Sequence, residues 1–145
     1  MGTWIVRAKP SQFRIHDFIR DFGFVEYRHT IKKMQEGDVV YLYITAPYKR
    51  VEYKMVVERA NIPLSEAFDD SSYSLLNPPR GNDDSDYFIR FKKIARVKSD
   101  YFDDLCYKKL LEHGFTYTMQ SDRPVNEETE TYIESIFKKE NYGNK

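Results

Sequence analysis

The sequence predicts an α+β protein, with one small, mixed but mainly antiparallel β-barrel or curved sheet flanked by about three helices. The expected elements follow the order strand, helix, several strands, helix, short strand and helix. Long hairpins replace the regular strand–helix alternation of a parallel sheet, which makes a doubly wound fold a poor match. The 145 residues amount to a single domain, which we expect over residues 1–140, with a tail at 141–145.

The N-terminal segment predicts a strand followed by a helix. Residues 3–7 are suited to a first strand, which Pro10 ends. The next apolar residues recur at i, i+3, i+4 and i+7 and are followed by Gly23, which predicts an amphipathic helix with a terminal glycine: Ile15, Phe18, Ile19 and Phe22. Residues 24–32 are expected to form a short strand or linker.

The most strand-like segment is residues 39–45, which follow a Gly37-Asp38 turn. Side chains alternate along a strand, so we expect two sets on opposite faces of the sheet. Val40, Leu42 and Ile44 form one set, and Val39, Tyr41, Tyr43 and Thr45 form the other. Residues 51–60 should pair with this strand as an antiparallel hairpin.

The C-terminal half alternates between loops and regular elements. Residues 61–86 are rich in Asp, Ser, Pro and Asn, and we interpret them as a variable, acidic, mobile loop. A long strand is expected over residues 87–97, and a helix from Asp100 to Gly114. A short strand over 115–119 and a last helix after Asn126 complete the prediction.

Composition excludes several classes of protein. Charges balance at 23 basic and 23 acidic residues, which argues against a polybasic nucleic-acid binder. The single cysteine, Cys106, excludes a disulfide framework and a multi-cysteine metal site. No apolar run approaches the roughly 18 residues of a membrane span, and no signal peptide is recognisable. We therefore expect a cytoplasmic protein without a membrane segment.

No enzyme motif is present. The sequence lacks phosphate-binding glycine loops, a zinc-protease motif and a nucleophile elbow. Cys106 and His113 are seven positions apart on one expected helix, too far for a catalytic dyad. The acidic cluster of Asp83, Asp84 and Asp86 lacks the glycine and distal glutamate of a calcium loop. We therefore expect no catalytic residues, no metal and no cofactor.

Aromatic residues provide the positive signal. The chain has 12 tyrosines and 10 phenylalanines but one tryptophan, and several lie beside arginines and lysines on expected strands. Flat rings with neighbouring cations suit a nucleobase and its phosphates. The alternative at this point is that these rings fill the core or form cross-strand pairs.

Several segments resemble one known family in their order and spacing. They are Thr3–Pro10 with its tryptophan, Gly37–Tyr48, the partner strand 51–57, and the closing Glu112-His113-Gly114 and Arg123-Pro124-Val125. They resemble the EVE domain, a branch of the PUA-like superfamily related to YTH domains. The resemblance covers most of the chain except residues 61–86.

This resemblance implies a PUA-like β-barrel with a pocket for one flipped, chemically modified base, such as a methylated cytosine or adenine. Many bacterial relatives resemble the reading modules of restriction systems. The implied protein is a non-catalytic module that binds nucleic acid, DNA rather than RNA. Cleavage would then come from a nuclease or ATPase partner.

The resemblance, together with the positions of the aromatic and cationic residues, implies which residues form the site. The expected base-binding pocket comprises Trp4, Arg7, Ala8, Tyr27, Tyr43, Thr45, Pro47, Tyr48, Tyr117 and Gln120. The expected phosphate-binding residues are Lys49, Arg50 and Arg123. We also expect residues 66–86 to lie away from the mouth of the pocket, because their acidity would repel a phosphate backbone.

Two alternatives stay open. PUA-like domains often bind RNA, so an RNA-binding role competes with DNA reading. ASCH-like relatives include a small amidohydrolase that acts on a modified nucleoside. For that activity Lys49, Thr45 and Glu52 would supply a base, a hydroxyl and an acid.

Overall fold

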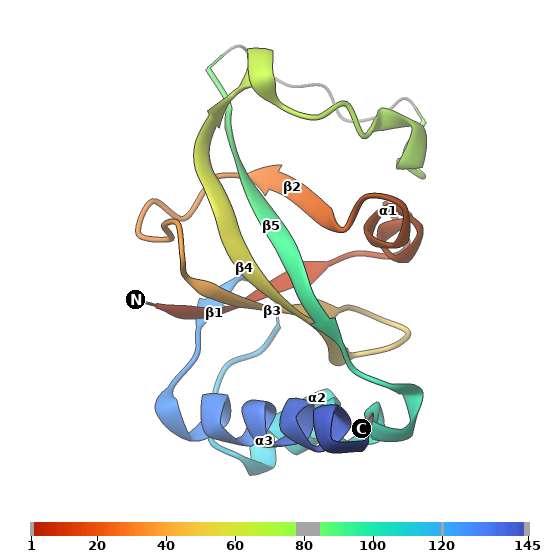
Figure 1. Cartoon of the computed structure of the whole chain (residues 1–145), viewed down its shortest axis with the longest axis vertical. Coiled ribbons are helices and arrows are strands. Elements are labelled where there is room, and N and C mark those ends of the chain that lie inside the picture. The colour runs from red at the N-terminus through yellow and green to blue at the C-terminus, as the bar shows by residue number, and fades with distance from the viewer. Residues whose placement is uncertain (1, 78–84, 120, 144–145) are drawn as a thin grey trace.

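A curved six-stranded sheet forms the centre of the protein in a computed structural model that describes residues 2–77, 85–119 and 121–143, with side chains up to residue 139. The strand order is β2-β5-β4-β3-β1-β6 (Figure 1). The strands are β1 (Thr3–Ala8), β2 (Phe24–Arg28), β3 (Val39–Ile44), β4 (Arg50–Pro63), β5 (Tyr87–Arg96) and β6 (Arg123–Pro124). The helices are α1 (Ile15–Phe22), α2 (Tyr107–Glu112) and α3 (Glu127–Gly143).

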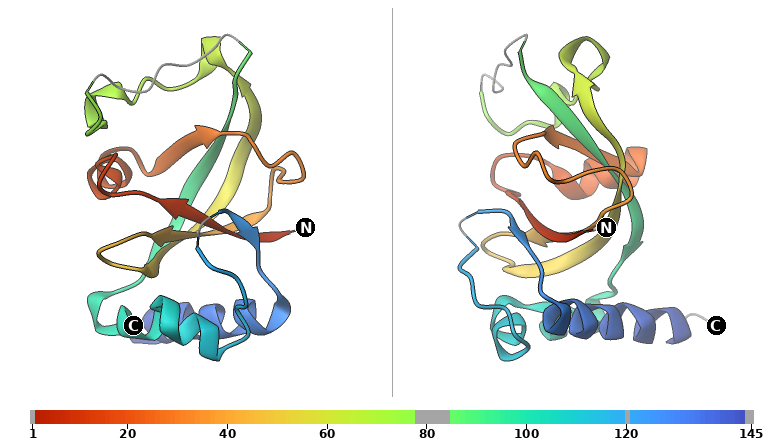
Figure 2. Two further views of the ribbon diagram at one scale, coloured as in Figure 1. Left: turned by 180° about the vertical axis from the view of Figure 1, so that it is seen from behind. Right: turned by 90° about the vertical axis from the view of Figure 1, so that its left-hand side faces the viewer.

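The α+β class and the mainly antiparallel sheet are confirmed. Among the named strands, β1 and β3 pair in parallel and every other pairing is antiparallel. The sheet is open, with β2 and β6 at its edges, and does not close into a barrel. Figures 1 and 2 show α2 and α3 at one end of the molecule, with residues 64–76 at the other end beyond α1.

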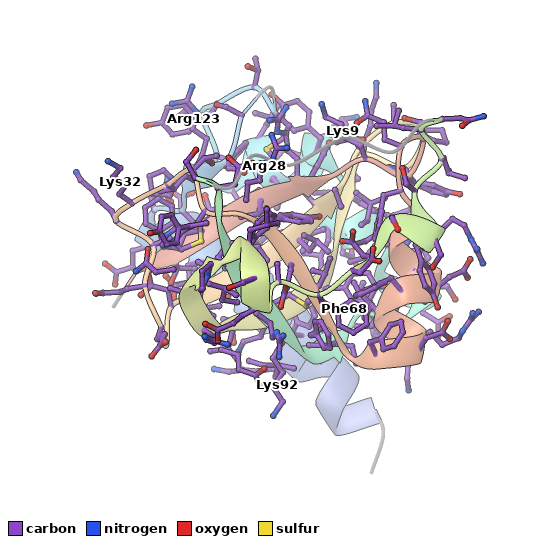
Figure 3. All side chains as sticks on the ribbon, turned by 90° about the horizontal axis from the view of Figure 1, so that it is seen from above. Lys9, Arg28, Lys32, Phe68, Lys92 and Arg123 are labelled. Atoms are coloured by element: carbon purple, nitrogen blue, oxygen red, sulfur yellow. The ribbon has the colours of Figure 1, made fainter. Side chains whose placement is uncertain are left out.

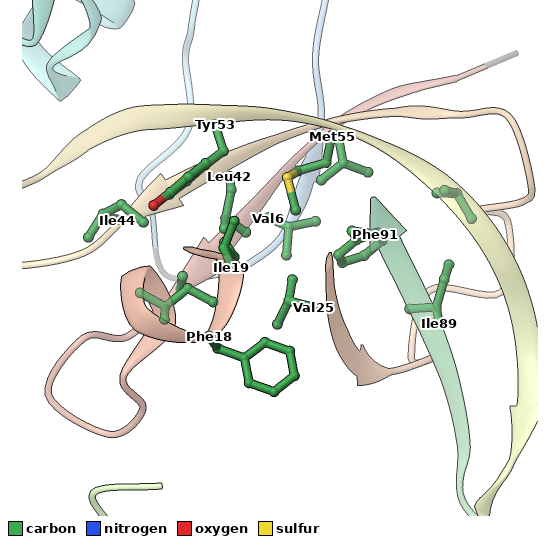
Figure 4. Packing of buried hydrophobic residues seen from close by; sticks show 14 of the residues in the cluster. Val6, Phe18, Ile19, Val25, Leu42, Ile44, Tyr53, Met55, Ile89 and Phe91 are labelled. Carbon is green, nitrogen blue, oxygen red and sulfur yellow. The ribbon is translucent and has the colours of Figure 1, made fainter. Parts of the chain in front are cut away.

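Two hydrophobic clusters pack on opposite faces of the sheet. On the α1 face, Val40, Leu42 and Ile44 of β3 belong to one cluster with the apolar side of α1, and Figure 4 shows Leu42 and Ile44 in it. On the α3 face, Tyr41 and Tyr43 pack against α2 and α3. The predicted alternation along residues 39–45 is therefore confirmed, and it explains why this strand is almost entirely buried.

The helix ends follow local sequence signals. Gly23 ends α1 in the left-handed region at φ 76°, where glycine carries no steric penalty, and its N–H bonds to the carbonyl of Ile19. Asn126 precedes α3, and its Oδ1 accepts the N–H of Thr129 at 2.8 Å. This is the N-cap bond that the sequence predicts.

The region between β5 and α3 differs from the prediction. The expected helix from Asp100 is two short 3-10 turns, Ser99–Tyr101 and Asp103–Leu105, followed by the six-residue α2. The break lies at Cys106, whose extended backbone forms a β-bridge with Arg50. Residues 115–119 form no strand, and the strand that joins the sheet edge is β6.

Asp38 joins the start of β3 to the start of β1. Its Oδ1 accepts the N–H of Gly2 at 2.9 Å, and its Oδ2 accepts Nε1 of Trp4 at 3.0 Å and the N–H of Gln35 at 3.1 Å. Burial by itself would raise the pKa of Asp38, but these hydrogen bonds outweigh burial and hold it below the usual 3.8. The Gly-Asp turn thus fixes the parallel β1–β3 pairing.

Because its folded-state pKa is lowered, Asp38 contributes stability in full above its usual pKa. That contribution is lost as pH falls through the lower folded-state value. We expect Asp38→Asn to lower the free energy of unfolding by about 1–3 kcal/mol near neutral pH. Urea unfolding at about pH 7 and about pH 3 measures this, and the gap between variant and wild type should narrow at the lower pH. An equal gap at both values would contradict a role for the Asp38 charge.

Candidate functional site

A cleft of about 710 Å³ opens on the α1 face. It lies between the end of β1 with the following loop, β2, and a segment that we call the arm, residues 64–76. Figure 3 looks onto this side, with Lys9 and Arg28 near its rim and Phe68 beside α1. The lining includes Arg7, Ala8, Lys9, Gln12, Tyr27, Arg28, Phe68, Asp69, Asp70 and Asp122.

Strand curvature brings β1 and β2 to the same cleft. The two strands are separated in the sheet order by β5, β4 and β3. Even so, Arg7 and Ala8 at the end of β1 and Tyr27 on β2 all line the cleft. Of the ten residues expected in the base-binding pocket, the structure brings these three together.

Tyr27 presents a neutral phenol to the cleft. Its ring packs edge-to-face on Phe91, with centroids 5.5 Å apart, and no hydrogen bond joins its hydroxyl to another described residue. Burial raises the pKa of Tyr27 well above its usual value, and the charges of Asp122 and Asp70 add to the shift. The hydroxyl therefore stays protonated and can donate a hydrogen bond to a ligand.

The arm is fixed to the sheet through Glu26 of β2, which is almost fully buried. Its Oε1 accepts the N–H of Phe68 at 2.8 Å. Its Oε2 accepts from Nε and Nη2 of Arg90 at 2.8 and 2.6 Å. One carboxylate thus joins the arm, β2 and β5.

Aromatic packing and backbone bonds hold the rest of the arm. The ring of Phe68 contacts three phenylalanines of α1 and β2 at centroid distances of 4.9–5.5 Å: Phe18, Phe22 and Phe24. The Tyr73 hydroxyl donates to Oδ2 of Asp21 at 2.6 Å, and the N–H of Leu75 donates to the carbonyl of Gln12 at 2.8 Å.

The expectation that residues 66–86 lie away from the binding mouth is wrong for the arm. Residues 67–71, 74 and 76 form a wall of the cleft. Phe68 and Tyr73 anchor this segment by packing on Phe18, which its acidic composition does not indicate. Residues 78–84 lie outside the described part of the chain.

The described residues that line the cleft carry mixed charges. Three of them are cations, Arg7, Lys9 and Arg28, and four are carboxylates, Glu26, Asp69, Asp70 and Asp122. Arg7 Nε lies 3.4 Å from Asp122 Oδ1, and Arg28 Nε lies 3.6 Å from Asp86 Oδ2. Burial raises the pKa of Asp70, and the charges of Glu26 and Asp69 add to that shift.

The closing segment reaches the cleft through Asp122, whose Oδ1 accepts the N–H of Arg7 at 2.9 Å. Its neighbour Arg123 is exposed, and its guanidinium lies 4.8 Å from the centroid of the Tyr117 ring. Tyr117 and Arg123 therefore lie beside the cleft and do not line it. Gln120, also expected in the pocket, lies outside the described residues.

Trp4 and Tyr43, both expected in the pocket, serve the packing of the fold. Trp4 donates its indole N–H to Asp38, as described above. Tyr43 is buried on the α3 face, where its ring meets Tyr107 with centroids 6.4 Å apart. Neither residue lines the cleft.

The remaining expected residues lie at the β3–β4 turn. They are Thr45, Pro47, Tyr48, Lys49 and Arg50, and none of them lines the cleft. The β3–β4 register shifts between Leu42 and Tyr43, so Glu52 has no partner across the ladder. Such bulges redirect a side chain, and here Glu52 is fully buried.

Arginines surround this buried carboxylate. Arg96 Nη2 donates to Oε1 of Glu52 at 3.1 Å, and Arg50 Nε lies 3.3 Å from Oε2. The Arg50 guanidinium lies 3.7 Å from the Phe102 ring centroid and 5.0 Å from that of Tyr48. Arg50, expected to bind phosphate, thus neutralises Glu52 and packs on two rings.

Glu52, the expected acid of the alternative hydrolase, has Arg50, Arg96 and His16 as its described charged partners. Lys49, the expected base, is exposed, and the hydrolase alternative stays a prediction. Burial lowers the pKa of His16, and the attraction of Glu52 offsets this only in part.

Within the described residues, no group of three or more His, Cys, Asp or Glu side chains is placed to hold a metal ion. No described helix is long and apolar enough to cross a membrane.

Comparison with solved structures identifies the fold. ASCH from Zymomonas mobilis matches with a TM-score of 0.63 and 11% identity over 93% of this chain and 95% of that one. A Rhodopseudomonas palustris protein solved by NMR matches at TM-score 0.62 and 12% identity, over 94% and 92% of the two chains. A hypothetical protein from Leishmania major matches at 0.62 and 16%, over 97% of each.

The chain shares the fold of these structures, ASCH among them. Membership of the PUA-like superfamily and of its EVE branch stays a prediction. No family model matches the chain, and no curated protein does either. At these identities the neighbours establish the fold, and the function has to be argued from the cleft.

The arm's attachment to Glu26 can be tested directly. We expect Glu26→Gln to place an amide N–H₂ against either Arg90 or the Phe68 N–H, both of which are donors. This mismatch should lower the free energy of opening the arm by about 1.5 kcal/mol or more. Amide exchange within residues 67–75 should then be about tenfold faster. Hydrogen–deuterium exchange with mass spectrometry measures it, with β3 as the internal reference.

Glu66→Gln provides a matched control on the arm itself. Glu66 pairs with Arg59 at 2.5 Å on the exposed surface, where solvent screens an ion pair and leaves it little effect on stability. Equal loosening by the two variants would show that Glu26 is not the anchor.

Proposed function

We propose that the protein is a non-catalytic module that reads a modified base in nucleic acid, with the base flipped into the cleft beneath the arm. The observation that carries this proposal is the cleft itself, which is lined by Tyr27 of β2, by the end of β1 and by the arm, three segments that are separate in the sequence. Its volume of about 710 Å³ falls in the range of small-molecule sites. The PUA-like fold is consistent with nucleic-acid binding.

Stacking alone does not make such a module bind tightly. One aromatic face such as that of Tyr27 contributes about 1–3 kcal/mol per base, and flipping a base out of a duplex costs a few kcal/mol. These two contributions nearly cancel. Hydrogen bonds to the edge of the base and burial of the added group must therefore supply the discrimination, and we expect weak binding by the isolated domain.

Phosphates would contact the rim and not the interior. Four carboxylates line the cleft, so a phosphate is better accommodated outside it. Lys9 is exposed at the wall of the cleft, and Arg123 is exposed next to Asp122. These two cations are our candidates for backbone contacts, in place of Lys49 and Arg50.

In this proposal the nucleic acid is DNA and the setting is cytoplasmic restriction or defence. Because the sequence carries no nuclease or NTPase motif, a partner protein would cut the marked DNA. Binding assays should nevertheless include methylated RNA and a search for turnover of modified nucleosides. Preference for RNA would replace DNA as the ligand, and turnover would replace the reader by an enzyme.

Tyr27 should carry base recognition. We expect Tyr27→Ala to weaken binding to an oligonucleotide with 5-methylcytosine or N6-methyladenine by about 1–3 kcal/mol. Fluorescence anisotropy measures the loss, after circular dichroism confirms folding. Tyr48→Ala, which truncates an exposed tyrosine outside the cleft, is the matched control and should bind as wild type does. A folded Tyr27→Ala protein with the wild-type preference would remove Tyr27 from the site.

Arg123 should hold the backbone without reading the base. We expect Arg123→Ala to weaken modified and unmodified oligonucleotides about equally, because a phosphate contact carries no direct sequence information. The slope of log K against log salt should flatten by about one. Lys138→Ala, on the exposed side of α3, controls for general charge loss. A change in the preference for the modified base would instead place Arg123 at the base.

A further inference from the structure

Two carboxylates line the same cleft as Tyr27. Asp70 comes from the arm, and Asp122 comes from the closing segment. Oδ1 of Asp122 is occupied by Arg7, whereas Oδ2 receives no hydrogen bond from another described residue. The sequence pattern predicts neither Asp70 nor Asp122 as a site residue.

Ionised carboxylates accept hydrogen bonds and cannot donate them. The edge of cytosine, like that of adenine, carries an amino group with two N–H donors beside a ring nitrogen that accepts. The edge of thymine or uracil instead presents carbonyl oxygens on both sides of a single N–H. A carbonyl oxygen and a carboxylate are both hydrogen-bond acceptors, so they repel each other when placed in contact. The carbonyl is then left without a hydrogen bond, which costs free energy for a buried polar group.

We propose that Asp70 and Asp122 make the cleft selective for bases that bear an exocyclic amino group, and that they reject bases with a carbonyl in that position. The inference rests on the proposed function and specifies its ligand class. The amino group donates to the carboxylates, while the face of the base stacks on the Tyr27 ring. A methyl group at a ring carbon leaves this pattern unchanged.

Matched pairs of bases compare an amino edge with a carbonyl edge. 5-Methylcytosine and thymine carry the same methyl group, but the first has an amino group beside an acceptor ring nitrogen, and the second has a carbonyl beside a ring N–H. Adenine and hypoxanthine differ in the same way. The probes are single-stranded DNA oligonucleotides that are identical except for the central base, and fluorescence anisotropy measures their binding to the full chain.

We expect the amino member of at least one pair to bind about tenfold more tightly than its carbonyl partner. Asp70→Asn and Asp122→Asn supply an amide donor that can pair with a carbonyl, so each should reduce the ratio to about threefold or less. Asp100→Asn, on the exposed 3-10 turn before α2, is the control and should leave the ratio unchanged.

Three results would overturn the inference, and they differ in what else they affect. Equal binding of both members of each pair, still weakened by Tyr27→Ala, would overturn amino selectivity and leave base reading intact. An unchanged ratio in folded Asp70→Asn and Asp122→Asn would overturn the assignment to these carboxylates. Binding that ignores the central base altogether would overturn the inference and the proposed function together.

Discussion

The cleft exists because β2 buries a carboxylate beneath the arm. Glu26 and Arg90 face each other across the β2–β5 ladder, and the Arg90 guanidinium also lies 4.4 Å from the Phe24 ring centroid. A buried carboxylate is costly unless its oxygens are paired, and for Glu26 the Phe68 N–H adds the bond to Oε1. The same bond that satisfies the charge therefore positions the wall of the site.

Local patterns predicted the parts of the fold that local forces determine. The alternation along residues 39–45, the glycine that ends α1 and the asparagine that caps α3 all act within a few residues. The arm depends on a bond between residues 42 positions apart, and no local pattern reports such a bond. The prediction of one helix after Asp100 was wrong for the same reason. A bridge to Arg50, which is distant in the sequence, holds Cys106 in an extended conformation.

The high aromatic content is explained mainly by packing, the plainer of the two interpretations of the sequence. Tyr41 stacks on Phe137 under α3, and five rings of α1, β2 and the arm pack in one cluster: Phe18, Phe22, Phe24, Phe68 and Tyr73. Tyr48 and Phe102 pack on the arginine that neutralises Glu52. Tyr27 is the one ring among those expected in the pocket that lines the described cleft, and this could not be told from composition.

The two-residue strand β6 also affects whether two copies of the protein can associate through the edges of their sheets. An open sheet leaves edge strands whose unpaired N–H and C=O groups can recruit another chain. At this edge Pro124 has no N–H to offer and Arg123 carries a charge, so the outer side of β6 is a poor template for a further strand. Growth of the sheet into a fibre or an edge-to-edge dimer is therefore blocked on this side, and a closed barrel is not needed to prevent it.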